Sequence, residues 1–135
     1  MPAPHRIGIV GYSGQKFDTV KATAILKEAL SLRAVNHQEC AVVTGLTDLG
    51  IPAIAYRVAD SLGMILVGVA CKKAQDYKCY DVHETVIVGE DWGDESEMFL
   101  SRIDELIKIG GGNQSAAEYA AFQGPKEEFE LEALS

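Results

Sequence analysis

Two kinds of apolar pattern alternate along the chain. Short runs rich in β-branched residues, typical of strands buried in a parallel sheet, are followed by longer segments in which apolar residues recur every three or four positions, as on one face of a helix. Right-handed crossovers between such strands predict an α/β protein, a single Rossmann-like doubly wound domain with a mostly parallel sheet of about five or six strands. The predicted strands cover residues 6–10, 40–44, 64–69, 85–88 and 105–109.

The apolar spacing predicts the buried face of some helices more clearly than that of others. A helix that begins near Ile51 has apolar residues at near-ideal spacing, and Pro52 fits its first turn because an N–H is unbonded there anyway. A short helix after Asp94 would carry Phe99 inward. The acidic tail at about 124–135 either adds a short edge strand or frays. The expected buried face of the first helix consists of Phe17, Val20, Ala24, Ile25, Ala29 and Leu32.

Three consecutive glycines follow the last of these strands and precede a predicted helix. Backbone N–H groups at a helix N-terminus carry partial positive charge, and glycines leave them open to a ligand, which is how many proteins bind phosphate. We expect a side chain at Gly112 to obstruct this contact, and its backbone to need a conformation that favours glycine. The predicted phosphate-binding residues are Gly110, Gly111, Gly112, Asn113, Gln114 and Ser115.

Two further loops with glycines follow the first and second predicted strands. Because ligands of such sheets bind beyond the carboxyl ends of the strands, near the point where strand order reverses, all three loops are expected to line one crevice. The candidate binding residues in these two loops are Gly11, Tyr12, Ser13, Gly14, Thr44, Gly45 and Gly50.

Several of these side chains also have simpler interpretations. Ser13 and Thr44 are equally well explained as turn residues after strands and as hydrogen-bond donors to phosphate or sugar. Tyr12 is better explained as a cover over the sheet than as a stacking partner for a base. Ser115 could be only a helix N-terminal residue. Glu118 could be only a favourable charge in the first turn, although a carboxylate beside a phosphate site suggests another contact, such as a ribose hydroxyl.

Composition limits the range of functions. The chain has 135 residues, 47% of them hydrophobic, which is enough for one core and predicts one domain over residues 1–135. Its net charge of −8 argues against a nucleic-acid polymer as partner but not against a single nucleotide held by backbone amides. No apolar run is long enough to span a membrane and no signal peptide is apparent, so we expect a cytoplasmic protein.

The residues that could bind a metal show no ligand pattern. The three cysteines lack C-x-x-C spacing, which predicts reduced thiols, and the histidines are scattered. The carboxylates of residues 90–97 stand at a helix start, where acidic residues are favoured, and are expected to be solvated. We therefore predict no metal site.

The three loops together resemble those of the Rossmann-like superfamily that contains the Lonely-guy (LOG) proteins, DprA and the molybdenum-cofactor-carrier proteins. The resemblance extends from about Ile7 to Phe122. The enzymatic Lonely-guy proteins carry a P-G-G-x-G-T-x-x-E motif and hydrolyse nucleoside 5′-monophosphates of cytokinin type. The matching residues are Gly111, Gly112, Ser115 and Glu118, whereas Gly110 replaces the proline and Gln114 replaces a glycine.

A second departure from that family concerns charge. The enzymatic branch places an Arg-Lys pair on the helix before the last strand, and residues 93–98 contain no basic residue here. The chain thus lacks a cation that would stabilise ribose-phosphate chemistry, for which Arg102 is the nearest substitute. The resemblance also implies a homo-oligomer.

Two classes of function agree with these residues. We favour binding of a nucleotide or a nucleotide-derived, phosphate-bearing small molecule, with a bound nucleotide as the only cofactor suggested. The alternative is a phosphoribohydrolase in which Glu118 is the catalytic residue that acts on the ribose and assists departure of the base. A carrier of a phosphate-bearing cofactor is a third, weaker possibility. The missing Arg-Lys pair favours binding, and the presence of Glu118 favours catalysis.

Overall fold

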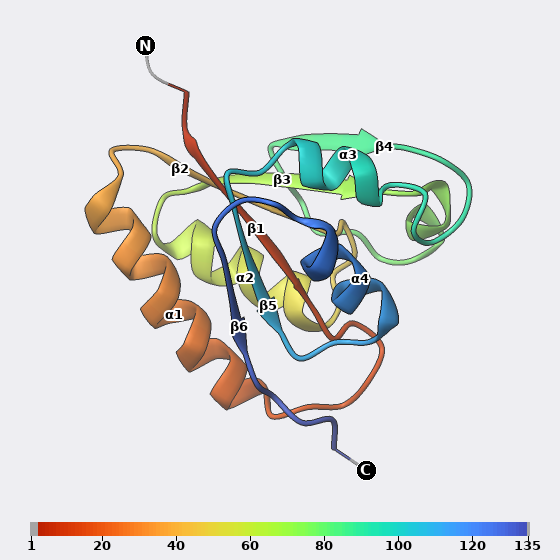
Figure 1. The fold of residues 1–135 in the computed structure, drawn as a ribbon, viewed down its shortest axis with the longest axis horizontal. Coiled ribbons are helices and arrows are strands. Elements are labelled where there is room, and N and C mark those ends of the chain that lie inside the picture. The colour runs from red at the N-terminus through yellow and green to blue at the C-terminus, as the bar shows by residue number, and fades with distance from the viewer. Residues whose placement is uncertain (1–2, 135) are drawn as a thin grey trace.

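The computed structural model describes residues 3–134, and they form one six-stranded, all-parallel sheet (Figure 1). The strands are ordered β4-β3-β2-β1-β5-β6. Their bounds are β1 His5–Gly11, β2 Cys40–Thr44, β3 Ile65–Ala70, β4 Glu84–Ile87, β5 Glu105–Ile109 and β6 Lys126–Phe129. The helices are α1 Thr19–Asn36, α2 Gly50–Ser61, α3 Ser96–Ser101 and α4 Asn113–Ala121, with a 3₁₀ turn, η1, at Lys72–Asp76.

This architecture confirms the predicted fold class. The five predicted strands all form, with bounds within one residue of those expected at each end. The apolar runs of β1, β2, β3 and β5 are largely buried, whereas β4 is a partly exposed edge strand. The acidic tail contributes β6, an edge strand that pairs in parallel with β5. A Rossmann-like α/β sheet therefore follows directly from the alternation of apolar patterns.

The sheet separates two apolar layers. On one side, α1 and α2 pack against a core that includes Ile7, Ile9 and Ile107. On the other side, α3 and α4 cover residues such as Val43 and Leu106. Among the described residues, no helix combines the length and apolar character that crossing a membrane requires.

Helix α1 buries a different face from the one predicted. Val20 and Leu32, expected inside, are 79% and 57% exposed, and Ala24 also faces outward. Small and apolar residues surround this helix on all sides, so their spacing alone selects no face, and packing against α2 and the sheet decides instead. The residues of α1 that are buried are Ala22, Leu26, Ala29 and Leu30.

The strand order reverses beside β1, and this fixes where a ligand site can form. Chain connection proceeds from β1 outward through β2 and β3 to β4, then returns through α3 to β5 on the other side of β1. The loops after β1 and β5 therefore diverge from adjacent strands at the carboxyl edge, which is the place where Rossmann-like sheets bind ligands.

The phenol of Tyr56 connects strands near this edge through hydrogen bonds. Tyr56 is fully buried in α2, and its hydroxyl lies 2.7 Å from the Gly45 carbonyl oxygen, 3.0 Å from that of Val67 and 3.1 Å from that of Thr44. Burial raises the pKa of Tyr56, so the hydroxyl keeps its single proton and shares it among these acceptors. One side chain thus joins the end of β2 and the middle of β3 to α2.

Replacing Tyr56 with Phe should lower the free energy of unfolding by about 1–2 kcal/mol, because buried carbonyls lose their donor without any loss of ring packing. Urea denaturation measures this change. The matched control is Tyr77→Phe, whose ring is 53% exposed and whose hydroxyl makes no hydrogen bond within residues 3–134. Equal stability of the Tyr56 variant and the wild type would show that these hydrogen bonds of the hydroxyl do not stabilise the fold.

Candidate functional site

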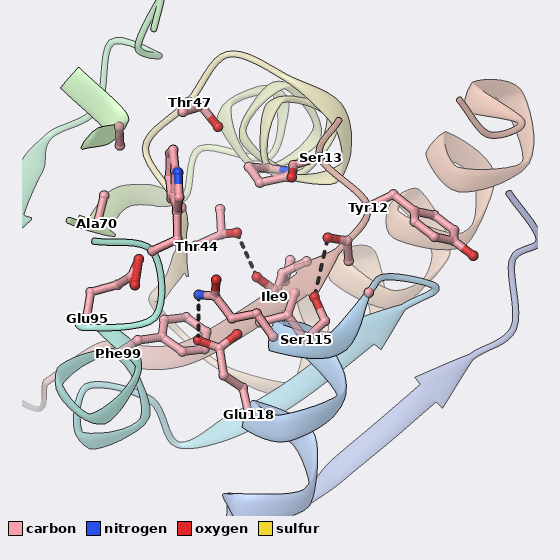
Figure 2. A pocket seen from close by; sticks show the side chains of 18 of the residues that line it. Ile9, Tyr12, Ser13, Thr44, Thr47, Ala70, Glu95, Phe99, Ser115 and Glu118 are labelled. Carbon is pink, nitrogen blue, oxygen red and sulfur yellow. Dashed lines mark hydrogen bonds between the residues drawn. The ribbon is translucent and has the colours of Figure 1, made fainter. Parts of the chain in front are cut away.

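A cavity of about 350 Å³ lies at the carboxyl edge of the sheet, above the point where strand order reverses (Figure 2). The loops after β1, β2 and β5 all contribute to its walls, together with the end of β3 and the start of α3. The convergence expected from the sheet topology is therefore present. The sequence-predicted residues that line the cavity are Gly11, Tyr12, Ser13, Gly14, Thr44, Gly45, Gly112, Asn113, Gln114, Ser115 and Glu118.

Three of the predicted glycines lie behind this lining and shape the loops. Gly50, at φ +57°, packs against the backbone of the loop after β1. Gly110, at φ +59°, faces the ring of Tyr12, which leaves no room for a side chain. Gly111 adopts φ +109°, and a Cβ there would lie 2.8 Å from the Ser115 side chain. These positions require glycine because of backbone conformation and crowding, without contributing to the cavity wall.

The expectation about the backbone of Gly112 is wrong. Gly112 has φ −98°, a value that other residues adopt readily, and a Cβ built on it meets no atom within 4 Å. The two preceding glycines adopt the positive φ angles instead, because they form the turn that follows β5. Gly112 is exposed and serves as the N-cap of α4.

The N-terminus of α4 presents free donors to the cavity. Gly112 supplies no capping side chain, and within residues 3–134 no carbonyl or side chain accepts from the backbone N–H of Asn113, Gln114 or Ser115. Donors of this kind carry the positive end of the helix dipole. The start of α2 differs, because Ile51 donates its N–H to Tyr12 O at 2.7 Å and Pro52 has none. Helix α4 is therefore the better anion-binding element.

Several hydroxyl groups near the loops already have protein partners. Thr44 is buried and donates its hydroxyl to Ile9 O at 2.6 Å, so its role is to join β2 to β1. Ser115 Oγ lies 3.4 Å from Gly11 O and connects α4 to the loop after β1. The Tyr12 ring points away from the cavity and stacks on Phe17, with 5.8 Å between ring centroids, as a cover residue would (Figure 2). Ser13 is exposed, and its hydroxyl makes no hydrogen bond within residues 3–134.

Glu118 points into the cavity from the second turn of α4 (Figure 2). It is 7% exposed, and its Oε2 accepts from Ser96 Oγ at 2.7 Å and from Gln114 Nε2 at 3.4 Å. Burial raises the pKa of Glu118, and the charge of Glu95 raises it further, although the hydrogen bonds from Ser96 and Gln114 oppose the shift. A buried carboxyl of this kind can accept hydrogen bonds from a ligand or deliver a proton to one.

The structure adds a second buried carboxylate that sequence reasoning assigned to solvent. Glu95 precedes α3, is only 6% exposed, and accepts from the Gly93 N–H at 2.7 Å through Oε1. Its burial could have been predicted from its distance in sequence to Phe99. Phe99 lies four residues later and was expected to face inward, and one helical turn places Glu95 on the same side. Its acidic neighbours at 90, 91, 94 and 97 are exposed, as expected.

The described residues that line the cavity include no Lys, Arg or His. Arg102, the nearest substitute for the missing Arg-Lys pair, lies outside the lining and contacts Glu84 at 3.2 Å. Lys72 and Lys73 form ion pairs with Glu90 and Asp91 at 2.9 and 2.7 Å. Any anion bound in the cavity would therefore depend on uncharged donors, foremost the backbone N–H groups at the start of α4.

Solved structures with the same architecture support the fold assignment. The molybdenum cofactor binding protein from the phototrophic bacterium Rippkaea orientalis superposes with a TM-score of 0.78 at 18% identity, over 96% of this chain and 78% of that chain. The molybdenum cofactor carrier protein from Chlamydomonas reinhardtii gives 0.75 at 20% identity, over 93% and 76%. At these levels of sequence identity, the similarity shows that the chain shares their Rossmann-like fold. No protein-family model and no curated protein sequence matches the chain.

The glycine turn allows a matched test of backbone strain. Gly111→Ser should lower the free energy of unfolding by about 1–3 kcal/mol, because a side chain at φ +109° is strained and meets Ser115. Gly112→Ser introduces the same side chain one position later, at an unstrained N-cap, and should leave stability unchanged or slightly raised. Thermal and urea unfolding of both variants measure the difference, and equal effects would refute this assignment of the turn.

Proposed function

We propose that the protein binds a nucleotide or a nucleotide-derived small molecule, with a phosphate group on the backbone N–H groups at the start of α4. The uncapped helix N-terminus at the switch point of the sheet carries this proposal. Three consecutive N–H groups there lack a protein partner within the described residues, and Gly112, which precedes them, has no side chain and open space around it. Such donors bind phosphate without help from a basic side chain.

The cavity has a suitable size and division of charge for such a ligand. Its volume of about 350 Å³ lies within the range of small-molecule sites. The helix N-terminus stands at one end, and the carboxylates of Glu95 and Glu118 stand deeper, beside apolar walls. A molecule with phosphate at one end and a neutral ring at the other avoids repulsion from the carboxylates. The molybdenum cofactor, named for the two proteins of similar fold, is a molecule of this class.

One observation favours a second function, hydrolysis of the N-glycosidic bond of a nucleoside monophosphate. Burial raises the pKa of Glu118, so this carboxyl can carry a proton nearer to neutral pH than an exposed glutamate can. A protonated carboxyl could assist departure of the base. The absence of a basic residue from the described cavity lining makes binding without turnover the better-supported function.

A charge placed at the N-cap of α4 tests the phosphate site. Gly112→Asp and Gly112→Asn introduce side chains of the same shape that can both cap the helix, but only Asp repels phosphate. Like charges about 4 Å apart near a protein surface repel by about 4 kcal/mol, so Gly112→Asp should bind nucleoside monophosphates at least about 100-fold more weakly than Gly112→Asn. Isothermal titration calorimetry measures both affinities.

The nucleosides without phosphate provide the control for this comparison. Their affinities should be similar in the two variants, because they offer no charge to repel. If Gly112→Asp and Gly112→Asn bind monophosphates equally well, the phosphate does not lie at the start of α4.

The binding and hydrolysis functions differ in the effect of Glu118→Gln. If the protein only binds, the wild type leaves a panel of nucleoside monophosphates intact, and the substitution weakens affinity by about 1–3 kcal/mol through loss of a charged acceptor. If it hydrolyses them, free base appears in the wild type, increases as the pH falls toward the raised pKa of Glu118, and disappears in the variant. Chromatography of the incubated panel distinguishes the outcomes, and we expect the first.

A further inference from the structure

The deep half of the cavity contains two carboxylates that the chain itself only partly satisfies. Glu95 and Glu118 are 6% and 7% exposed. Each uses one oxygen within the protein, Glu95 Oε1 with the Gly93 N–H and Glu118 Oε2 with Ser96 Oγ. Within residues 3–134, neither Glu95 Oε2 nor Glu118 Oε1 accepts a hydrogen bond, and each oxygen keeps some exposure to solvent. Two acceptors on largely buried side chains therefore remain available to a ligand.

The two side chains come from different elements and line the same cavity. Figure 2 shows the Glu95 and Glu118 side chains directed into the cavity from the start of α3 and from α4. Both residues line the same cavity, and the negative charge of Glu95 contributes to the raised pKa of Glu118. Ser96, the residue after Glu95, donates to Glu118 and fixes their relative position.

The walls around these carboxylates are apolar and partly aromatic. Leu46, Val69, Ala70, Trp92 and Phe99 line this part of the cavity. Apolar walls favour a flat ring, and buried carboxylate oxygens without a cationic partner favour N–H donors on its edge. A ring edge that presents acceptors, or a second phosphate, would be repelled there.

We propose that Glu95 and Glu118 together determine ligand specificity by accepting two adjacent N–H donors of a 2-amino-4-oxopyrimidine ring edge. That edge occurs in guanine and in pterins, and in both it offers a ring N–H beside an amino group. Each free carboxylate oxygen accepts one of these donors, while the apolar walls hold the ring faces. This inference rests on the proposed binding function and adds the chemical class of the ring.

Pairs of probes that differ at the 2-position test the proposal. Guanosine 5′-monophosphate and inosine 5′-monophosphate differ only by the 2-amino group, and pterin and lumazine differ by exchange of that amino group for a carbonyl oxygen. The wild type should bind the 2-amino member of at least one pair 10-fold or more tightly than its counterpart, as measured by calorimetry. The pair with the larger difference identifies the ring as purine or pterin. Guanosine and inosine repeat the purine comparison without phosphate.

Conservative variants connect this preference to the two carboxylates. In Glu95→Gln and in Glu118→Gln, the amide oxygen keeps the hydrogen bond to Gly93 or Ser96, so the amide NH₂ takes the place of the free acceptor. Each variant should reduce the preference to within about 2-fold. The control is Glu97→Gln, which removes the same charge from an exposed residue of α3 outside the cavity and should keep the full preference. Far-ultraviolet circular dichroism checks that all three fold.

The outcomes separate this inference from the proposed function. Equal affinity within both pairs would overturn the inference, and tighter binding of the monophosphates than of the nucleosides would still support the phosphate site. A 2-amino preference without any gain from phosphate would sustain the inference and refute that site. A preference that survives both Gln variants would show that other residues read the ring, and would also overturn it.

Discussion

The site depends on a close approach between two backbone segments at the centre of the sheet. Gly11 ends β1 directly beside Ile109 of β5, and a side chain on Gly11 would collide with the Ile109 carbonyl. Gly111 then passes so near that its missing Cβ would lie 3.2 Å from Gly11 Cα. Because no side chain separates the two loops, the N-terminus of α4 reaches the switch point and can present its N–H groups there.

The distribution of charge around this contact determines which ligands the cavity can accept. Backbone dipoles at the start of α4 provide the positive potential, whereas the buried side chains provide only negative charge. Backbone donors are fixed by the fold and cannot follow a ligand as a lysine side chain can. Recognition of an anion should therefore depend strongly on the geometry of the glycine turn.

The parts of the molecule set by local pattern could be predicted from sequence, and the parts set by packing could not. Apolar runs such as 40–44 identified the strands, and the glycines after them identified the three loops. The prediction of the buried face of α1 was wrong because Val20 and Leu32 are as apolar as Leu26, so only packing against α2 and the sheet decides which face is buried. Glu95 was missed because neighbouring acidic residues concealed one buried position, which only the Phe99 spacing indicated.

The C-terminal segment links the edge of the sheet to the wall of the cavity. After β6, the Leu131 carbonyl packs against Gly110, and the Leu134 N–H donates to Lys16 O at 2.8 Å, in the loop that joins β1 to α1 (Figure 1). The segment therefore braces the loop after β1 from outside, so residues 130–134 help to hold one wall of the cavity in place although they do not line it.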